Sequence, residues 1–248
     1  TTQNLIIAGD KVTIRGILFD KDGTLIDFDQ TWMPAYHAAL DDLCRPLSDP
    51  NVKNRCLVAS GYDIDRGCTV PNSALAVEGS DDIAMIWLKA AGQPSEKAAI
   101  DRLVQIMEDY SADHPVPLFD VATLFKRLTD RHLKLGIATM DAEWVARRSM
   151  DKLSAAEHIQ FYAGYDSGFG RKPGPGMVQK YCADTNLQPD QIIVVGDNLH
   201  DLHMSISAGA ALSVGVCSGV ANRDDFADVA DHVIEDATEI EDLLDQLN

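Results

Sequence analysis

The chain has 248 residues, of which 46% are apolar, and its 39 acidic and 21 basic residues give a net charge of −18 at pH 7. A chain of this length can bury a full hydrophobic core, in one large domain or in two smaller ones. The negative charge repels nucleic acids and anionic membrane surfaces and argues against both as partners. It also repels phosphorylated small molecules, so such a substrate would need a cation or a local basic group to hold it.

Hydropathy and cysteine usage predict a cytoplasmic protein with free thiols. No run approaches the roughly 18 apolar residues of a membrane span, and the apolar stretch LIIA near the N-terminus is too short for a signal peptide. The cysteines are odd in number, scattered and without a C-x-x-C pair, which favours buried free thiols over disulfides or a zinc site. They are Cys44, Cys56, Cys68, Cys182 and Cys217.

Four apolar runs, each ending at a small or polar residue, predict buried strands of a parallel sheet. They are GILFD at 16–20, KLGIAT at 134–139, IIVVGD at 192–197 and LSVGV at 212–216. Helical spacing of apolar residues over 121–128 predicts a helix between the strands, and a second helix is expected over about 142–153. Strands that alternate with helices indicate a doubly wound, Rossmann-like α/β fold.

The segment between Asp27 and Pro117 has helical spacing and no convincing strand. GQPS at 92–95 separates two amphipathic stripes and places Pro94 where a helix can begin. The stripes are Ile83, Ile86, Trp87 and Ala90, and Ile100, Leu103, Val104 and Met107. A helical insertion of roughly 80 residues predicts an all-helical second domain after the first strand. We expect an α/β core domain over 1–28 and 115–248 and a helical domain over 29–114.

The last 25 positions, 224–248, carry ten acidic residues and no lysine or arginine. Ile240, Leu243 and Leu244 keep one side of this segment apolar. This pattern favours the solvated face of a final helix over an interaction tail.

Asp20, Thr139 and Asp197 end three of the predicted strands. Open α/β sheets bind ligands at the carboxyl ends of their strands, so these side chains are candidates for one site. An Asp-Gly pair is also typical of a plain turn. The pattern D-x-D-G-T-L from Asp20, however, would arise by chance with a probability on the order of one in ten thousand on average residue usage.

Two other binding motifs fail on spacing. An EF-hand that began at Asp20 would need Gly at its sixth position and Glu at its twelfth, where this chain has Leu25 and Thr31. A nucleotide-binding P-loop is excluded because GFGRKPGPG at 168–176 lacks Gly-Lys-Ser/Thr at the required spacing.

Four stretches resemble, in order, the signature motifs of the haloacid dehalogenase (HAD) superfamily of phosphatases. They are DKDGTL from Asp20, LGIAT ending at Thr139, RKPGPG around Lys172, and GDNLHD at 196–201. The resemblance spans about residues 15–217, and the inserted helices look like the C1 cap of that family. The interval from Thr139 to Lys172 has room for one helix and one short strand, but not for the alternative cap.

The resemblance implies that Asp20 is a nucleophile that forms an aspartyl-phosphate. Asp22 would protonate the leaving alcohol and then activate water as a general base. Close carboxylates raise each other's pKa, and a metal bound to Asp20 would favour its ionised form. The pair could then hold one proton between them, which separates the two roles.

The resemblance also implies Mg²⁺ as a cofactor. The Asp20 carboxylate, the Asp22 main-chain carbonyl and the Asp197 carboxylate would hold it. Asp201 would orient the metal-bound waters or Lys172. Mg²⁺ and Lys172 would together make a small cationic pocket in an acidic protein.

Phosphate binding is implied for the Thr139 hydroxyl, the Met140 amide and Lys172. Lys172 would neutralise the negative charge that gathers as one anion attacks another. An arbitrary lysine is usually solvated, but the Lys-Pro-Gly-Pro context of Lys172 favours a role in the site. The family often has Asn or Ser where this chain has Met140. The backbone donor survives that change, and one side-chain contact is expected to be missing.

Asp22 favours phosphomonoester hydrolysis, because dehalogenases, phosphonate hydrolases and P-type ATPases of the superfamily carry other residues there. A phosphomutase, similar to β-phosphoglucomutase, shares Asp22 and the C1 cap and remains the alternative. A non-catalytic phosphate-binding protein on the same fold is a second alternative, opposed by the presence of Asp20, Asp22 and Lys172.

The segment 60–80 resembles a cap segment of the phosphoglycolate phosphatase subgroup, so phosphoglycolate or a sugar phosphate is the expected substrate class. Arg66 is a candidate for binding a second anionic group, although a solvated arginine is the commoner case. A monomer and a homodimer are both compatible with the sequence.

Overall fold

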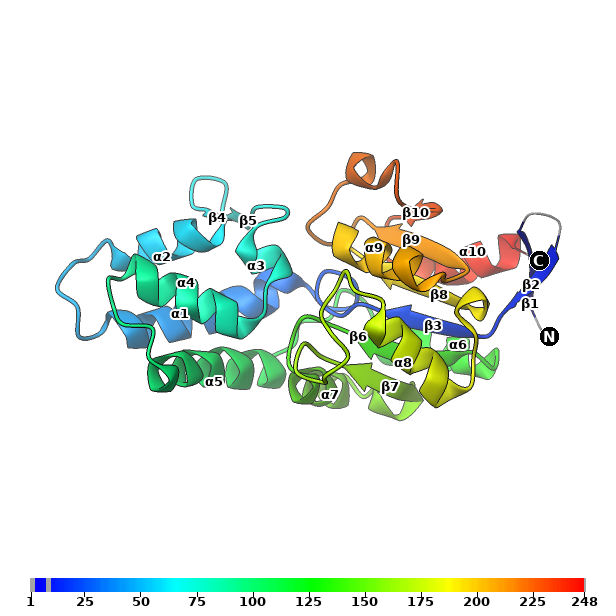
Figure 1. Cartoon of the computed structure of the whole chain (residues 1–248), viewed down its shortest axis with the longest axis horizontal. Coiled ribbons are helices and arrows are strands. Elements are labelled where there is room, and N and C mark those ends of the chain that lie inside the picture. The colour runs from blue at the N-terminus through cyan, green and yellow to red at the C-terminus, as the bar shows by residue number, and fades with distance from the viewer. Residues whose placement is uncertain (1–2, 8–9, 248) are drawn as a thin grey trace. The chain divides into compact units, whose positions relative to one another are not determined.

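The computed structural model describes residues 3–7 and 10–247, and the described chain divides into two compact units (Figure 1). The boundaries fall between Asp27 and Phe28 and between Val116 and Pro117. We call the unit that contains both ends of the chain the sheet unit, and the unit over 28–116 the helical unit.

Within the described residues of the sheet unit, six parallel strands form one sheet in the order β10-β9-β8-β3-β6-β7 (Figure 1). Their bounds are β3 Gly16–Phe19, β6 Lys134–Ala138, β7 Ile159–Ala163, β8 Ile192–Gly196, β9 Leu212–Val216 and β10 His232–Ile234. The four predicted strands are confirmed as β3, β6, β8 and β9. Strand β7 lies in the interval that was expected to hold one short strand, and β10 was not predicted.

Helices cover both faces of this sheet because its strands are apolar on both faces. On one face, Phe19 and its neighbours pack with α6, α7 and α10, and on the other face Leu18 packs with α8 and α9. The helices are α6 Val121–Asp130, α7 Glu143–Lys152, α8 Gly176–Thr185, α9 Leu199–Ala208 and α10 Ile240–Gln246. Short 3₁₀ turns span Ala156–His158, Pro189–Gln191, Arg223–Phe226 and Ala237–Glu239.

The two helices predicted over 121–128 and 142–153 are confirmed as α6 and α7. The final helix is confirmed over Ile240–Gln246, where Ile240, Leu243 and Leu244 are buried while Asp242 and Asp245 are exposed. Seven of the ten acidic residues of 224–248 precede this helix, which corrects the expectation that they form its solvated face. The doubly wound α/β architecture is therefore confirmed.

An antiparallel hairpin that was not predicted precedes the sheet. It consists of β1 Gln3–Ile7 and β2 Asp10–Ile14.

The register of the central strand brings the predicted site residues to one edge of the sheet. Phe19 of β3 pairs with Ile137 of β6 on one side and with Val195 of β8 on the other. The Asp20 amide donates to the Val195 carbonyl at 2.8 Å, which extends the pairing by one residue. Residues that follow these three strands therefore emerge together at their carboxyl ends.

The helical unit contains α1 Phe28–Cys44, α2 Val52–Ser60, α3 Ala74–Val77, α4 Ser80–Ala90 and α5 Lys97–Asp113. A two-residue ladder between β4 Tyr62–Asp63 and β5 Cys68–Thr69 corrects the expectation that this segment holds no strand. The ladder is too short to show alternation in the sequence. Helix α5 begins at Lys97, not at Pro94.

Aromatic side chains form the centre of the helical unit. The Tyr36 and Trp87 rings meet edge to face at 5.5 Å between centroids. Trp87 is fully buried, and its Nε1 donates to Ser60 Oγ at 2.9 Å. This contact satisfies the one polar atom of the Trp87 side chain inside an otherwise apolar core.

The five cysteines are free, as predicted, but only Cys56 and Cys182 of them are buried; the other three are half-buried. None of the helices within residues 3–7 and 10–247 is long and apolar enough to cross a membrane.

Candidate active site

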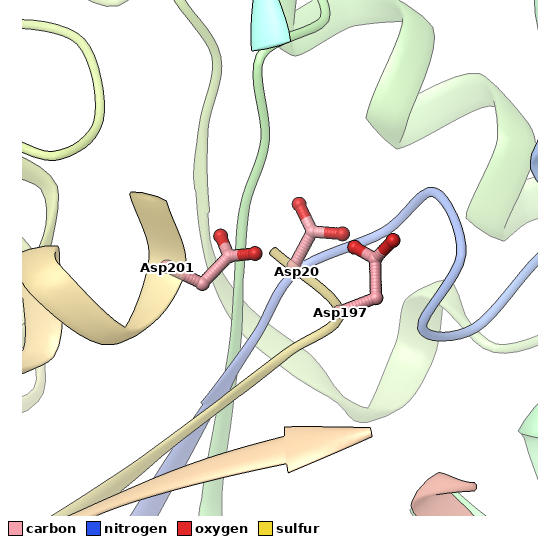
Figure 2. A group of neighbouring side chains, drawn as sticks. All are labelled: Asp20, Asp197 and Asp201. Atoms are coloured by element: carbon pink, nitrogen blue, oxygen red, sulfur yellow. The ribbon is translucent and has the colours of Figure 1, made fainter. Parts of the chain in front are cut away.

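The carboxyl ends of β3 and β8 and the first turn of α9 bring three buried aspartates together. Figure 2 shows the carboxylates of Asp20, Asp197 and Asp201 projecting into the same space. Each offers one oxygen that lies within 4.8 Å of the others, the one such acidic cluster in the described part of the chain. The cluster is a candidate metal centre.

Lys172 lies inside this cluster and not on the surface. Its Nζ is 2.6 Å from Asp20 Oδ1 and also pairs with Asp201 Oδ1. The Lys172 and Asp201 side chains are each only 2% exposed. The loop that precedes α8 therefore delivers an ammonium group to the end of β3.

Asp201 is held by the start of α9 as well as by Lys172. Its Oδ2 accepts from the Asn198 amide at 3.2 Å, and the Asn198 side chain accepts from the His200 amide at 3.1 Å. This reciprocal capping box fixes the first turn of the helix. Of the two partners that the sequence left open for Asp201, the structure shows the contact with Lys172.

Burial and mutual repulsion dominate the electrostatics of the cluster. Burial raises the pKa of the Asp20 carboxyl to about 7; Lys172 opposes that rise, while Asp201 and Asp22 add to it. Burial, together with the charges of Asp20 and Asp201, also raises the pKa of Asp197 well above its usual range. Burial lowers the pKa of Lys172, but the two aspartates beside it outweigh that effect and raise it.

Glycines make room for the Asp197 carboxylate. A Cβ at Gly219 would lie 1.9 Å from Asp197 Oδ2, and a Cβ at Gly23 would lie 2.4 Å from the same atom. Gly23 also has φ +77°, a conformation that favours glycine. The Val220 amide donates to Asp197 Oδ2 at 2.9 Å. The Gly of DKDGTL thus serves the fourth motif by leaving space for its aspartate.

The donor set fits a hard divalent cation. Three ionised carboxylates against one ammonium group would leave this buried cluster with excess negative charge, and carboxylate oxygens are the ligands that Mg²⁺ prefers. Lys172 and the Asn198 amide contact both oxygens of Asp201, whereas Asp20 and Asp197 each have one oxygen engaged. Asp20 and Asp197 are therefore the better candidates to hold the ion.

Thr139 follows β6 directly and is buried. Its amide donates to the Ala163 carbonyl at 2.9 Å, so the sheet uses the backbone donor of this residue. Its hydroxyl accepts from the Asp141 amide at 3.1 Å. The Thr139 hydroxyl is therefore held in the loop between β6 and α7, where the half-buried Met140 follows it.

Sequence reasoning missed a second buried lysine. Lys21, which occupies the variable position of D-x-D-G-T-L, is fully buried. Its Nζ is 2.8 Å from Asp22 Oδ2 and 2.6 Å from Asp141 Oδ2. The signal was weak: a lysine that is buried at the end of an apolar strand needs acidic partners, but a lysine between two aspartates is also typical of a solvated turn.

Asp141 was also missed. Burial raises the pKa of its carboxyl well above the usual range, the charge of Asp22 adds to the rise, and Lys21 opposes it.

Arg66, the candidate for a second anionic group, is exposed in the turn between β4 and β5 of the helical unit. Its amide donates to Asp63 Oδ1 at 3.0 Å.

Comparisons with known proteins agree with this geometry. The family model for haloacid dehalogenase-like hydrolases matches residues 71–214, more than half of the chain. A phosphoglycolate phosphatase from Rhodospirillum rubrum is 26% identical over 235 residues, which cover 88% of this chain and 90% of that protein. An N-acetylmuramic acid 6-phosphate phosphatase from Pseudomonas putida is 25% identical over 238 residues, covering 94% and 96%.

Among solved structures, a protein from Thermotoga maritima that is provisionally named beta-phosphoglucomutase has a TM-score of 0.68 at 16% identity. The match covers 95% of this chain and 100% of that one, and it supports the fold. The match to the family model shows the family, and the acidic cluster at the strand ends agrees with it. The chain belongs to the haloacid dehalogenase-like hydrolase family.

Proposed function

We propose that this phosphoric monoester hydrolase cleaves a small phosphomonoester with the help of one Mg²⁺, through a phosphorylated Asp20. The observation that carries the proposal is the contact of 2.6 Å between Lys172 Nζ and Asp20 Oδ1, buried beside Asp197 and Asp201. An anionic nucleophile that must meet an anionic ester needs positive charge close by, and this arrangement supplies it.

The first step forms a bond between Asp20 and phosphorus while the bond from phosphorus to the leaving oxygen breaks. Asp22 donates its proton to that oxygen, so the product leaves as a neutral alcohol. In the second step, water attacks the phosphorus of the aspartyl-phosphate and Asp22 takes up its proton. The bond from Asp20 to phosphorus breaks, which releases phosphate and restores the Asp20 carboxylate.

The other residues bind charge and fix orientation. Lys172 neutralises the equatorial oxygens, and the Thr139 hydroxyl and the Met140 amide donate hydrogen bonds to them. Asp20, Asp197 and the Asp22 carbonyl would hold the Mg²⁺, and Asp201 would keep Lys172 in place. Bound there, Mg²⁺ supplies further charge for the transferring phosphoryl group and favours the ionised form of Asp20.

For the substrate, we propose phosphoglycolate first and a sugar phosphate second. The Rhodospirillum rubrum and Pseudomonas putida relatives, whose names give a small acid phosphate and an amino-sugar phosphate, support this class. We assign to the helical unit the role of a C1 cap that selects the ester, with Arg66 as its candidate anion contact. The cytoplasm is the proposed compartment.

A phosphomutase is the second candidate, since the Thermotoga maritima structure shares the fold. A mutase would pass the phosphoryl group of Asp20 back to a sugar, whereas a phosphatase passes it to water. Incubation with a hexose phosphate separates the two, because only hydrolysis releases inorganic phosphate in proportion to substrate consumed.

The proposal is tested by phosphate release from p-nitrophenyl phosphate, 2-phosphoglycolate, hexose phosphates and nucleoside monophosphates, with Mg²⁺ and with a chelator. We expect Mg²⁺-dependent release and a preference for a small ester over p-nitrophenyl phosphate. Absence of Mg²⁺-dependent turnover would contradict the proposed phosphatase activity. Equal rates on all esters would contradict the proposed substrate class. Asp20→Asn is the control for a contaminating phosphatase.

A further inference from the structure

The buried Lys21 joins two loops of the site that are far apart in sequence. It extends from the end of β3, and its Nζ contacts both carboxylate oxygens of Asp22, at 2.8 and 2.9 Å. The same atom lies 2.6 Å from Asp141 Oδ2 in the loop between β6 and α7. The Lys21 ammonium group thus links Asp22, in the first motif, to the loop after Thr139, in the second motif.

Both ends of this link are themselves fixed. The Lys21 carbonyl accepts from the amides of Leu25 and Ile26, at 2.8 and 3.1 Å, which closes the turn that carries Asp22. The Asp141 amide donates to Thr139 Oγ1 at 3.1 Å, and the Asp141 carbonyl accepts from the Tyr165 amide at 2.9 Å. The chain of contacts therefore runs from Asp22 to the proposed phosphate-binding hydroxyl.

Stability alone is a poor reason for such a link. Burying the Lys21 ammonium group with two carboxyl groups costs free energy that their mutual attraction only partly returns, and well-packed apolar residues often do as well. A buried ionic group is better explained where it fixes a geometry. Here the geometry is the position of the Asp22 carboxyl relative to Thr139.

We propose that Lys21 and Asp141 are positioning residues that hold the Asp22 carboxyl where it can reach the leaving oxygen of a phosphate bound at Thr139. The inference rests on the proposed function, in which Asp22 is the general acid. It goes beyond that function by giving a part in the reaction to Lys21, at the variable position of the first motif, and to Asp141, two residues after Thr139.

The proposal predicts a loss that depends on the leaving group. An alkoxide is a poor leaving group and needs the proton of Asp22, whereas p-nitrophenolate leaves without it. The value of kcat/KM reports the steps up to the first irreversible one, which is the step that expels the leaving group. A misplaced acid should therefore lower kcat/KM for alkyl esters and spare p-nitrophenyl phosphate.

The experiment compares kcat/KM of Lys21→Met on p-nitrophenyl phosphate and on 2-phosphoglycolate or glucose 6-phosphate, whichever the unchanged protein hydrolyses faster. We expect a fall of about 100-fold on the alkyl ester, typical of a lost general acid, and of less than about tenfold on the aryl ester. Lys134→Met is the matched control, because Lys134 is a half-buried lysine at the opposite end of β6. It should leave the ratio of the two values unchanged.

Two further variants keep the test decisive if Lys21→Met does not fold. Lys21→Met/Asp141→Asn removes one charge of each sign, and Asp141→Asn alone keeps the shape of the side chain. Both should show the same selective loss on the alkyl ester. Equal losses on the two esters, or full alkyl activity in the double variant, would overturn the positioning role. If the unchanged protein hydrolyses neither ester with Mg²⁺, the proposed function itself fails.

Discussion

The sheet unit and the helical unit bury different kinds of side chain. The described part of the helical unit buries one charged residue, Glu108, and centres on Trp32, Tyr36 and Trp87. Among the residues whose burial the structure describes, the sheet unit buries six charged residues, all at the carboxyl ends of its strands or in the loops and first helical turns that follow them. These six are Asp20, Lys21, Asp141, Lys172, Asp197 and Asp201.

This difference separates stability from chemistry. Apolar and aromatic burial stabilises a fold, whereas buried charges cost free energy and persist where a reaction needs them. Substitutions at the strand ends of the sheet unit should therefore cost activity, and substitutions in the core of the helical unit should cost stability. Four experiments test this division.

The largest effect is expected for Asp20→Asn. Loss of the nucleophile should lower turnover on the order of 10⁴-fold or more. Stability without Mg²⁺ near neutral pH should not fall, because burial makes the ionised Asp20 unfavourable. Parallel rate assays and thermal unfolding check both halves. A variant that loses much of its stability would break the division.

Trp87→Ala is the reverse case. Truncating this fully buried ring should destabilise the helical unit by about 3 to 5 kcal/mol, which urea unfolding followed by circular dichroism measures. Ser60→Ala, which leaves Trp87 Nε1 without its acceptor, should cost about 1 to 3 kcal/mol. The Mg²⁺ concentration for half-maximal rate should stay the same in both variants while they are folded. A shift in that concentration would contradict the separation.

Gly219→Ala should weaken the proposed metal site without removing a ligand. The added Cβ would meet Asp197 Oδ2 at 1.9 Å and push the carboxylate out of place. We expect the Mg²⁺ concentration for half-maximal activity to rise about tenfold or more. Gly209→Ala is the control: its Cβ would meet nothing within 4 Å, and the backbone strain at its φ of +73° falls at the opposite end of α9 from Asp201. Equal Mg²⁺ requirements in the two variants would argue against Asp197 as a ligand.

The smallest effect concerns pH. The folded-state pKa of Asp20, about 7, lies above its ordinary value of 3.8. Its contribution to stability is therefore complete below pH 3.8 and is lost as the pH rises through about 7. Because Mg²⁺ would bind the ionised form, the rise in Tm on adding Mg²⁺ should be larger at about pH 8 than at about pH 5.5. Asp20→Asn should reduce that difference, and an equal rise at both pH values would contradict the assignment.

One feature of the sequence, apolar runs with polar ends, predicted both most of the sheet and its acidic cluster. Three of the four apolar runs end at a polar residue, and parallel strands bring such ends together, so Asp20, Thr139 and Asp197 could be placed at one edge. Strands β4, β5 and β10 have only two or three residues, too few for a pattern to emerge.

Lys21 and Asp141 were not predicted as site residues, for a different reason. A lysine between two aspartates is typical of a solvated turn, and its burial depends on a partner that follows another strand. Only the pairing of β3 with β6 brings Asp141 next to Lys21. Tertiary contacts of this kind leave little trace in a single sequence, whereas Lys172 could be found because its Lys-Pro-Gly-Pro context resembles a known motif.

The central claim is that Asp20 carries the phosphoryl group. The direct test is acid quenching of the protein during turnover with Mg²⁺ and the preferred ester, followed by mass spectrometry of the peptide that contains Asp20. The account predicts a phosphoryl group on that peptide in the unchanged protein and none in Asp20→Asn. Full turnover without a phosphorylated peptide, together with turnover that persists in Asp20→Asn, would contradict it.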